Sequence, residues 1–299
     1  MTAAISVVGV SRRHRDHLAL DAVSLQVEAG SITGLLGRNG AGKTTLMRII
    51  AAQDFASAGE VRVMGADPVE DDAVLRRIVL VREDQIYPRY VRVWQLLRMA
   101  SWCYPNWSQE LAETLLRDFD LPAGRRVERL SRGMRSALGI VIGLAARTEV
   151  TLFDEPYAGL DAVARDRFYD RLLTEYTERP RAMILSTHLI DEIAGLLERV
   201  VVLHRGRVVL DAPTDDLRGS ASIVSGPALA VDQFVAGRRT WDRRRIGSQA
   251  SAIVVGPVTE VDAARARSLR LEVEALTLQQ VVVRTAAERD ASAEERTSA

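Results

Sequence analysis

Hydrophobic residues follow two different periods along this chain. Short apolar or alternating runs predict strands at residues 5–8, 23–27, 32–36, 59–65, 77–82, 150–153, 182–186 and 200–203. Between residues 91 and 146 the apolar positions recur about every 3.6 residues, which predicts helices broken at Pro105 and at residues 122–124. Several strands are apolar on both faces, so we expect an α/β protein with a largely parallel sheet covered on both sides.

The same pattern divides the chain into regions. The first strands predict an N-terminal antiparallel β patch, and residues about 83–146 a helical insertion subdomain. Pro213 marks the expected end of a main domain at residues 1–212, followed by an accessory region at 213–285. Within this small C-terminal extension, residues 269–283 predict a strand and a short helix. The charged, small-residue-rich end at 286–299 is expected to be a disordered tail.

A glycine-rich loop joins the strand at residues 32–36 to a helical run that begins at Leu46. The loop matches G-x-x-x-x-G-K-[ST] and comprises Gly37, Arg38, Asn39, Gly40, Ala41, Gly42, Lys43, Thr44 and Thr45. Its glycines let successive N–H groups point at a β-phosphate, and the following helix N-terminus favours negative charge. Lys43 would add a full charge for the β- and γ-phosphates, and the Thr44 hydroxyl can hold Mg²⁺. The sequence therefore predicts a P-loop NTPase core that binds a nucleoside triphosphate.

Two carboxylates end the apolar strand at residues 150–153. Asp154 would bind Mg²⁺, directly or through water, beside Thr44. Glu155 is placed to polarise a water molecule toward the γ-phosphate. Paired acids at a strand end can also cap the next helix, but the upstream phosphate loop favours the catalytic interpretation.

A third motif opens the amphipathic helix that runs toward Ala146. Ser131 is a natural N-cap, and Gly133 lets backbone N–H groups approach an anion closely. Alone, this pattern indicates no more than a helix start. Its position just before the strand that carries Asp154 and Glu155 makes the motif diagnostic of a nucleotide-binding family.

With these motifs, the chain resembles the ATP-binding cassette (ABC) ATPases of membrane transporters over residues 5–212. Residues 130–134 resemble their signature motif, usually Leu-Ser-Gly-Gly-Gln, and residues 158–161 their D-loop, with Asp161. Ser186-Thr187-His188 resembles the segment that carries their switch histidine. This histidine would contact the γ-phosphate and hold the attacking water in position beside Glu155. The resemblance implies that Lys43, Glu155 and His188 are the catalytic residues.

The resemblance also implies a dimer with two shared sites. Each ATP would lie between the Lys43 loop of one subunit and the signature helix of the other. The signature residues acting in trans would be Ser131, Arg132, Gly133 and Met134. Arg132 stands where the family usually has glycine, and Met134 where it has glutamine. Ser131 and Gly133, the positions nearest phosphate, are kept, so we expect the half-site to work.

Two further positions depart from the family pattern. The aromatic residue that usually stacks on adenine falls at His14, whose imidazole offers a smaller stacking surface than tyrosine. The family's Q-loop glutamine corresponds to Gln85 by identity and to Glu83 by spacing. Either side chain could contribute an oxygen to Mg²⁺, and Gln85 is favoured.

Composition limits the choice of partners. Lys plus Arg and Asp plus Glu each number 40, so a net charge of zero gives no overall drive toward nucleic acid. An arginine cluster at residues 238–245 is interpreted as a solvated face. The longest uncharged apolar run, 137–146, is far shorter than the ~18 residues of a membrane-spanning helix.

The chain contains one cysteine, Cys103, so no internal disulfide is possible and a reducing cytoplasm fits. The neighbouring Trp102 and Tyr104 predict that Cys103 packs in the core. The aromatic segment at 102–107 is equally a candidate docking surface for a membrane partner. The expected location is cytoplasmic, peripherally attached to the cytoplasmic face of the membrane.

The leading hypothesis is an ATPase subunit of an ABC exporter of the drug, antibiotic or lipid class, using ATP and Mg²⁺. Its partners would be a second copy of itself, or a paralogous ATPase, and a separately encoded integral membrane permease. The alternative is a soluble ABC ATPase acting in translation, DNA repair or metal-cluster assembly. Such translation factors usually carry two cassettes and DNA-repair members a long coiled coil, and neither feature is present here.

Overall fold

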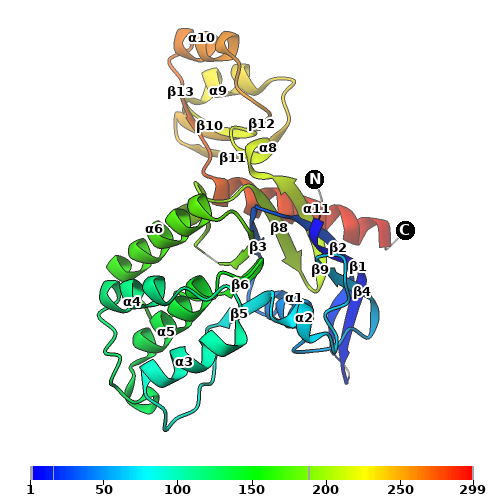
Figure 1. The fold of residues 1–299 in the computed structure, drawn as a ribbon. Helices are drawn as coiled ribbons and strands as arrows, with labels where there is room; N and C mark the ends of the chain where they lie inside the picture. The colour runs from blue at the N-terminus through cyan, green and yellow to red at the C-terminus, as the bar shows by residue number, and fades with distance from the viewer. Residues whose placement is uncertain (1–2, 16, 188, 298–299) are drawn as a thin grey trace. The chain divides into compact units, whose positions relative to one another are not determined.

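The chain divides into two compact units in a computed structural model that describes residues 3–15, 17–187 and 189–297 (Figure 1). The first unit comprises residues 1–188 and 196–211, and the second comprises residues 189–195 and 212–299. The boundary expected near Pro213 falls at the end of a strand, β9 (Arg207–Pro213).

A six-stranded sheet with the order β5-β6-β7-β3-β8-β9 forms the centre of the first unit. The strands before β9 are β3 (Ile32–Leu36), β5 (Ile78–Arg82), β6 (Val150–Asp154), β7 (Ala182–Ser186) and β8 (Arg199–His204). Neighbours from β5 to β8 pair in parallel, which confirms the predicted α/β fold. Every residue of β3, β6 and β7 is buried, as their mainly apolar sequences predict. Because these three strands run parallel to one another, their carboxyl ends meet at one edge of the sheet.

The N-terminal antiparallel patch is present as a three-stranded sheet with the order β2-β1-β4. Its strands are β1 (Ala3–His14), β2 (His17–Glu28) and β4 (Ala58–Val63). Helix α1 (Lys43–Ile50) contacts strands of both sheets. Its buried side chains, including Leu46 and Met47, join one hydrophobic core with residues of β1, β2, β6 and β7. This shared core fixes the helix that begins at Lys43.

Helices occupy the segment where the 3.6-residue period predicted them. The helical elements of the first unit after α1 are α2 (Asp72–Leu75), α3 (Val93–Cys103), α4 (Gln109–Asp118), the 3-10 helix η1 (Val127–Arg129), α5 (Arg132–Ala145) and α6 (Ala162–Glu178). Helix α5 packs on β5 and β6 and buries every residue from Ala137 to Ala145. In the part of the chain that the structure describes, none of the helices combines the length and hydrophobicity needed to cross a bilayer.

The core position predicted for Cys103 is wrong. The residue ends α3 and is exposed to solvent, and the neighbouring Trp102 keeps 66% of its surface exposed. Helix α3 buries Val93, Leu96 and Leu97 instead. These residues lie on the opposite face from Trp102, because side chains at three- and four-residue intervals share one helix face.

The second unit is built on a four-stranded antiparallel sheet with the order β11-β12-β10-β13. Its strands are β10 (Ala221–Pro227), β11 (Thr240–Ile246), β12 (Gln249–Val255) and β13 (Glu272–Ala275). Its helices are α7 (Ile190–Ile193), α8 (Thr214–Leu217), α9 (Ala228–Val235), α10 (Glu260–Ser268) and α11 (Leu278–Thr297). A separate core around Val231, Phe234 and Val254 joins α9 to the sheet.

Helix α11 is longer than the short helix predicted, because it continues to Thr297 through residues expected to form a disordered tail. Ala, Glu and Arg dominate this stretch, and all three are strong helix formers. A composition that lacks large apolar residues is therefore compatible with a solvated helix as well as with disorder.

The arginine cluster of the second unit is neutralised locally. Arg238 pairs with Asp262, and this ion pair, with hydrogen bonds from Thr259, lowers the pKa of Asp262 to about 2. The other pairs are Arg239 with Glu288, Arg243 with Asp232 and Arg244 with Asp242. These carboxylates reduce the positive charge that a polyanion would need.

Candidate functional site

The phosphate-loop sequence connects β3 to α1 and follows a path that needs glycine. Gly37 and Gly42 have φ angles of 147° and 106°, which disfavour any side chain. A Cβ atom on Gly37 would lie 2.4 Å from the carbonyl oxygen of Leu203, and one on Gly42 would lie 2.7 Å from that of Ala19. Both neighbours are backbone atoms, so there is no room for a side chain at these two positions. The glycine spacing is thus a requirement of this conformation.

Lys43 begins α1, and its side chain folds back across the loop. Its Nζ donates a hydrogen bond of 2.7 Å to the carbonyl oxygen of Gly37 and a longer one of 3.5 Å to that of Arg38. The residue is only 6% exposed, and Glu155 Oε1 lies 3.8 Å from the ammonium. The structure therefore places a buried positive charge between the phosphate loop and the end of β6.

Thr44 and Asp154 are in direct contact although 110 positions separate them. Thr44 Oγ1 donates to Asp154 Oδ2 at 2.5 Å, and Ser186 Oγ donates to Asp154 Oδ1 at 2.6 Å. The parallel register that aligns Asp154 with Ser186 explains the second contact. Hydroxyl and carboxylate oxygens are the ligands that Mg²⁺ prefers, so this donor set fits the metal.

Glu155 follows β6 in an uncommon backbone conformation, with φ at 49°. Its N–H group donates to the carbonyl oxygen of Ser186 at 3.3 Å. Its Oε1 atom faces Lys43 at 3.8 Å, and its Oε2 atom accepts from the Tyr157 hydroxyl at 3.3 Å. The carboxylate thus lies beside the phosphate loop.

The signature segment forms the N-terminus of α5. Ser131 is its N-cap, as predicted, with Oγ accepting a 3.2 Å hydrogen bond from the N–H of Met134. Arg132, which replaces the usual glycine, pairs with the Glu83 carboxylate. Gly133 lies against the D-loop, because a Cβ atom there would be 2.6 Å from the carbonyl oxygen of Gly159.

Replacing Gly133 with alanine is expected to displace this helix start. Overpacking against a backbone atom costs about 1–3 kcal/mol, and the better helix propensity of alanine, about 1 kcal/mol, offsets only part of it. We expect a lower melting temperature and a lower ATPase rate. Gly124→Ala is the matched control, since a Cβ atom at Gly124 would meet no other atom within 4 Å. Equal stability and activity of the two variants would contradict the close packing of Gly133.

The two Q-loop candidates have different surroundings. The Glu83 carboxylate is engaged by Arg132, whereas the Oε1 atom of Gln85 is buried with no hydrogen-bond partner among the described residues. The main chain at Glu83 contacts the site directly, because its N–H group donates to the Asp154 carbonyl oxygen at 3.0 Å. Burial raises the pKa of the nearby Tyr87 phenol above its ordinary value. An unpartnered buried oxygen favours Gln85 as a ligand donor.

The remaining predicted residues are less informative. His14 ends β1 and is exposed, with its Nε2 atom 3.8 Å from Asp54 Oδ2. Asp161 caps α6 by accepting a 2.8 Å hydrogen bond from the N–H of Ala164. His188 lies outside the described residues.

Sequence reasoning missed two polar contacts of this site. Ser186 stands out in the sequence only as part of the switch motif, yet it holds Asp154 directly. The rule that neighbouring parallel strands end together would have indicated this contact. Tyr157 carried no recognisable signal, since only the folded turn after Pro156 brings its hydroxyl back toward Glu155.

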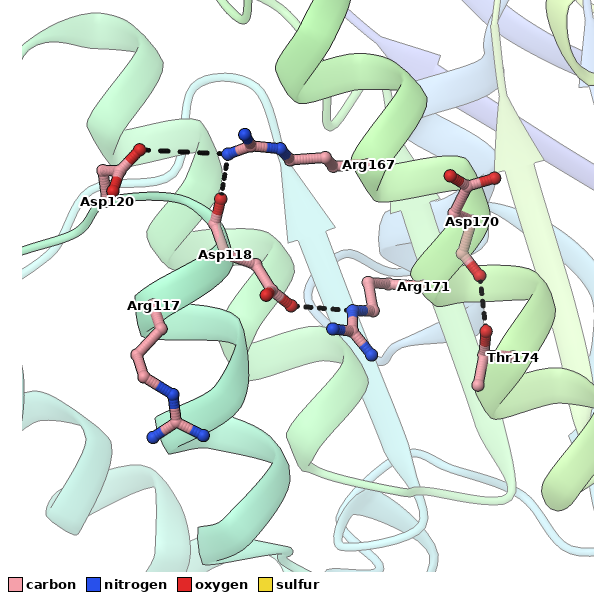
Figure 2. Close-up of a pocket in the computed structure, with 7 residues that line it drawn as sticks. All are labelled: Arg117, Asp118, Asp120, Arg167, Asp170, Arg171 and Thr174. Carbon is pink, nitrogen blue, oxygen red and sulfur yellow. Dashed lines mark hydrogen bonds and ion pairs between the residues drawn. The ribbon is translucent and has the colours of Figure 1, made fainter.

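A surface hollow of about 480 Å³ lies apart from these residues, between α4 and α6 (Figure 2). It is lined by Arg117, Asp118, Asp120, Arg167, Asp170, Arg171 and Thr174. Arg171 Nε lies 2.7 Å from Asp118 Oδ2, and Arg167 approaches both Asp120 and the Asp118 carbonyl oxygen. Arg167 and Arg171 thus pair with the end of α4, so the hollow is explained by ion pairs that join two helices.

Comparison with known proteins agrees with this geometry. Residues 20–158 match the family described as ABC transporter. Over 197 residues the chain is 30% identical to the ABC transporter ATP-binding protein YtrB of Bacillus subtilis, covering 66% of this chain and 67% of YtrB. It is 33% identical over 221 residues to the daunorubicin resistance ATP-binding protein DrrA3 of Streptomyces coeruleorubidus, covering 72% and 70% of the two chains.

A solved structure gives the same result. The ATP-binding subunit of an ABC transporter superimposes with a TM-score of 0.66 at 25% identity, covering 72% of this chain and 92% of that one. The fold and the site therefore define a P-loop ATPase. The chain belongs to the family of ABC transporter ATP-binding proteins. The alternative of a soluble ABC ATPase acting in translation, DNA repair or metal-cluster assembly is not favoured.

Proposed function

We propose that this chain hydrolyses ATP as the paired motor subunit of an ABC exporter and drives a separate membrane permease. The observation that carries the proposal is the meeting of Lys43, the Thr44–Asp154 pair and Glu155 at one edge of the sheet. The similarity to DrrA3, named for daunorubicin resistance, supports export of a drug-like molecule.

Three oxygen donors are proposed to hold Mg²⁺. Thr44 and Asp154 are already in contact, and Gln85 offers a buried oxygen that lacks a partner among the described residues. When bound, Mg²⁺ would neutralise charge on the β- and γ-phosphates. Ser186 holds the Asp154 carboxylate in place from the opposite oxygen.

Glu155 is proposed as the general base. It would accept a proton from water while the water oxygen bonds to the γ-phosphorus. The bond from that phosphorus to the β–γ bridging oxygen breaks, and ADP leaves with the electron pair. Lys43 would turn from the loop carbonyl groups to the phosphates, and His188 would hold the water in register. His14 would stack on the adenine ring.

Dimerisation would complete each site. The capped N-terminus of α5, with Ser131 and Gly133, presents N–H groups and a positive helix end that suit the γ-phosphate of a partner subunit. Asp161 of the D-loop would lie at the same dimer interface. The pairing of Arg132 with Glu83 leaves the Ser131 cap intact.

The helical segment offers the docking surface proposed for the permease. Exposed apolar residues gather before and along α3, namely Ile86, Tyr90, Trp94, Met99 and Trp102. The Arg98 guanidinium lies over the Trp102 ring, 5.6 Å from its centre, and Trp102 is still largely exposed to solvent. Exposed aromatic residues and arginine are typical of interface centres.

Affinity purification from native membranes tests the partnership. The native chain is expected to recover one integral membrane protein, and Trp94→Glu combined with Trp102→Glu should abolish that recovery. Leu173→Glu on α6, where the leucine is 46% exposed, is the matched control. Recovery of ribosomes or DNA in a salt-sensitive manner, with no membrane protein, would overturn the exporter assignment.

A further inference from the structure

We propose that Tyr157 is a positioning residue that holds the Glu155 carboxylate in its working orientation. The inference rests on the proposed role of Glu155 as the base. Tyr157 lies two residues after Glu155 and is only 4% exposed. Its hydroxyl lies 3.3 Å from Glu155 Oε2 and 2.7 Å from Thr187 Oγ1.

The direction of these hydrogen bonds follows from the chemistry of the groups. An ionised carboxylate only accepts, so the single Tyr157 proton is donated to Glu155. The Thr187 hydroxyl then donates to the Tyr157 oxygen, which completes a relay from Thr187 through Tyr157 to Glu155. Thr187 is buried and immediately precedes His188, so the relay joins the two segments that carry the proposed base and the switch histidine.

The local backbone fixes the tyrosine in this position. Residues 155–158 form a turn in which the N–H of Ala158 donates to the Glu155 carbonyl oxygen at 3.1 Å. Pro156 occupies the second turn position, where its restricted φ is favourable. Helix α5 holds the turn from outside, because Ser136 Oγ donates to the Ala158 carbonyl oxygen at 2.5 Å.

The Tyr157 contact with Glu155 does not depend on Lys43, which faces the other carboxylate oxygen. Oε1 faces Lys43 at 3.8 Å while that ammonium bonds to the loop carbonyl groups. Once Lys43 turns to phosphate, the Tyr157 hydroxyl still keeps Oε2 from swinging away. The hydroxyl thereby leaves Oε1 available to the attacking water.

Tyr157→Phe tests the inference by removing one oxygen atom and keeping the ring. We expect kcat for ATP hydrolysis to fall roughly tenfold, the effect of losing one hydrogen bond to a charged group, with KM for ATP changed less than about twofold. Tyr176→Phe is the matched control, since its hydroxyl bonds to Glu198 at 2.5 Å within the first unit but away from the phosphate loop. Its kcat should remain native.

A double-mutant cycle separates positioning from a structural role. In a Glu155→Gln background, Tyr157→Phe should lower the residual rate no further, because both changes act on one group. Thr187→Val should lower kcat less than Tyr157→Phe does. Combined with Tyr157→Phe, it should lower kcat no further.

Native kcat in Tyr157→Phe, or an undiminished tenfold loss in the Glu155→Gln background, would overturn the positioning role. A fall in melting temperature with a parallel rise in KM would assign Tyr157 to folding alone. The Glu155→Gln variant by itself tests whether Glu155 is the base. An error in that proposal and an error in the role of Tyr157 therefore give different results.

Discussion

Replacing Glu155 with glutamine is expected to slow ATP hydrolysis by about 10²–10⁴-fold, the range for losing a positioned base. The amide keeps the shape of the side chain but accepts a proton poorly. ATP binding should survive, because the phosphate loop and Lys43 are untouched. A dimer with trapped ATP should therefore accumulate, detectable by size-exclusion chromatography with light scattering.

Glu149→Gln is the matched control for this experiment. Glu149 lies just before β6, at the opposite end of that strand from Glu155, and pairs with Arg77 at 2.6 Å. Its substitution should leave the hydrolysis rate native. If Glu155→Gln hydrolysed ATP at the native rate, another group would have to be the base. Full activity of a strictly monomeric chain would refute the shared site.

Lys43→Ala is expected to weaken ATP binding itself by about 10- to 150-fold, which corresponds to losing 1.5–3 kcal/mol of charge-assisted hydrogen bonding. The ammonium is buried, and the charged side chain beside it, Glu155, has the wrong sign to replace it. Isothermal titration with ATP and Mg²⁺ measures the change. Hydrolysis should fall in parallel.

Arg48→Ala provides the comparison for Lys43→Ala. Arg48 lies on the same helix but approaches the Gln53 carbonyl oxygen, at 3.5 Å, at the far end of α1. Its loss should leave ATP affinity native. Native ATP affinity in Lys43→Ala would show that the loop backbone alone binds the phosphates.

Local sequence signals were sufficient for most of the first unit. Mainly apolar runs predicted the buried parallel strands, and the spacing of the phosphate loop predicted a strand, a turn and a helix in that order. Such features depend on residues close in sequence. Thr44 and Asp154 could be paired in advance because the carboxyl ends of parallel strands meet at one edge.

The second unit was harder to predict. Residues 220–258 lack clear periodicity in the sequence but form β10, α9, β11 and β12. Strand β11 is mostly exposed, so its pattern contains little apolar alternation. Its place in the sheet comes from pairing with β12, a tertiary contact that side-chain pattern alone does not encode.

The sequence by itself determined which groups are available: a glycine-rich loop, a lysine, a hydroxyl, and two acids at the end of a buried strand. Only the tertiary structure decided how Glu155 is held, because the Tyr157 hydroxyl meets Thr187 across 30 positions of chain. It also decided that Cys103 faces solvent and that Arg132 pairs with Glu83. Residue identity fixes what a side chain can do, whereas its partners depend on how distant segments pack.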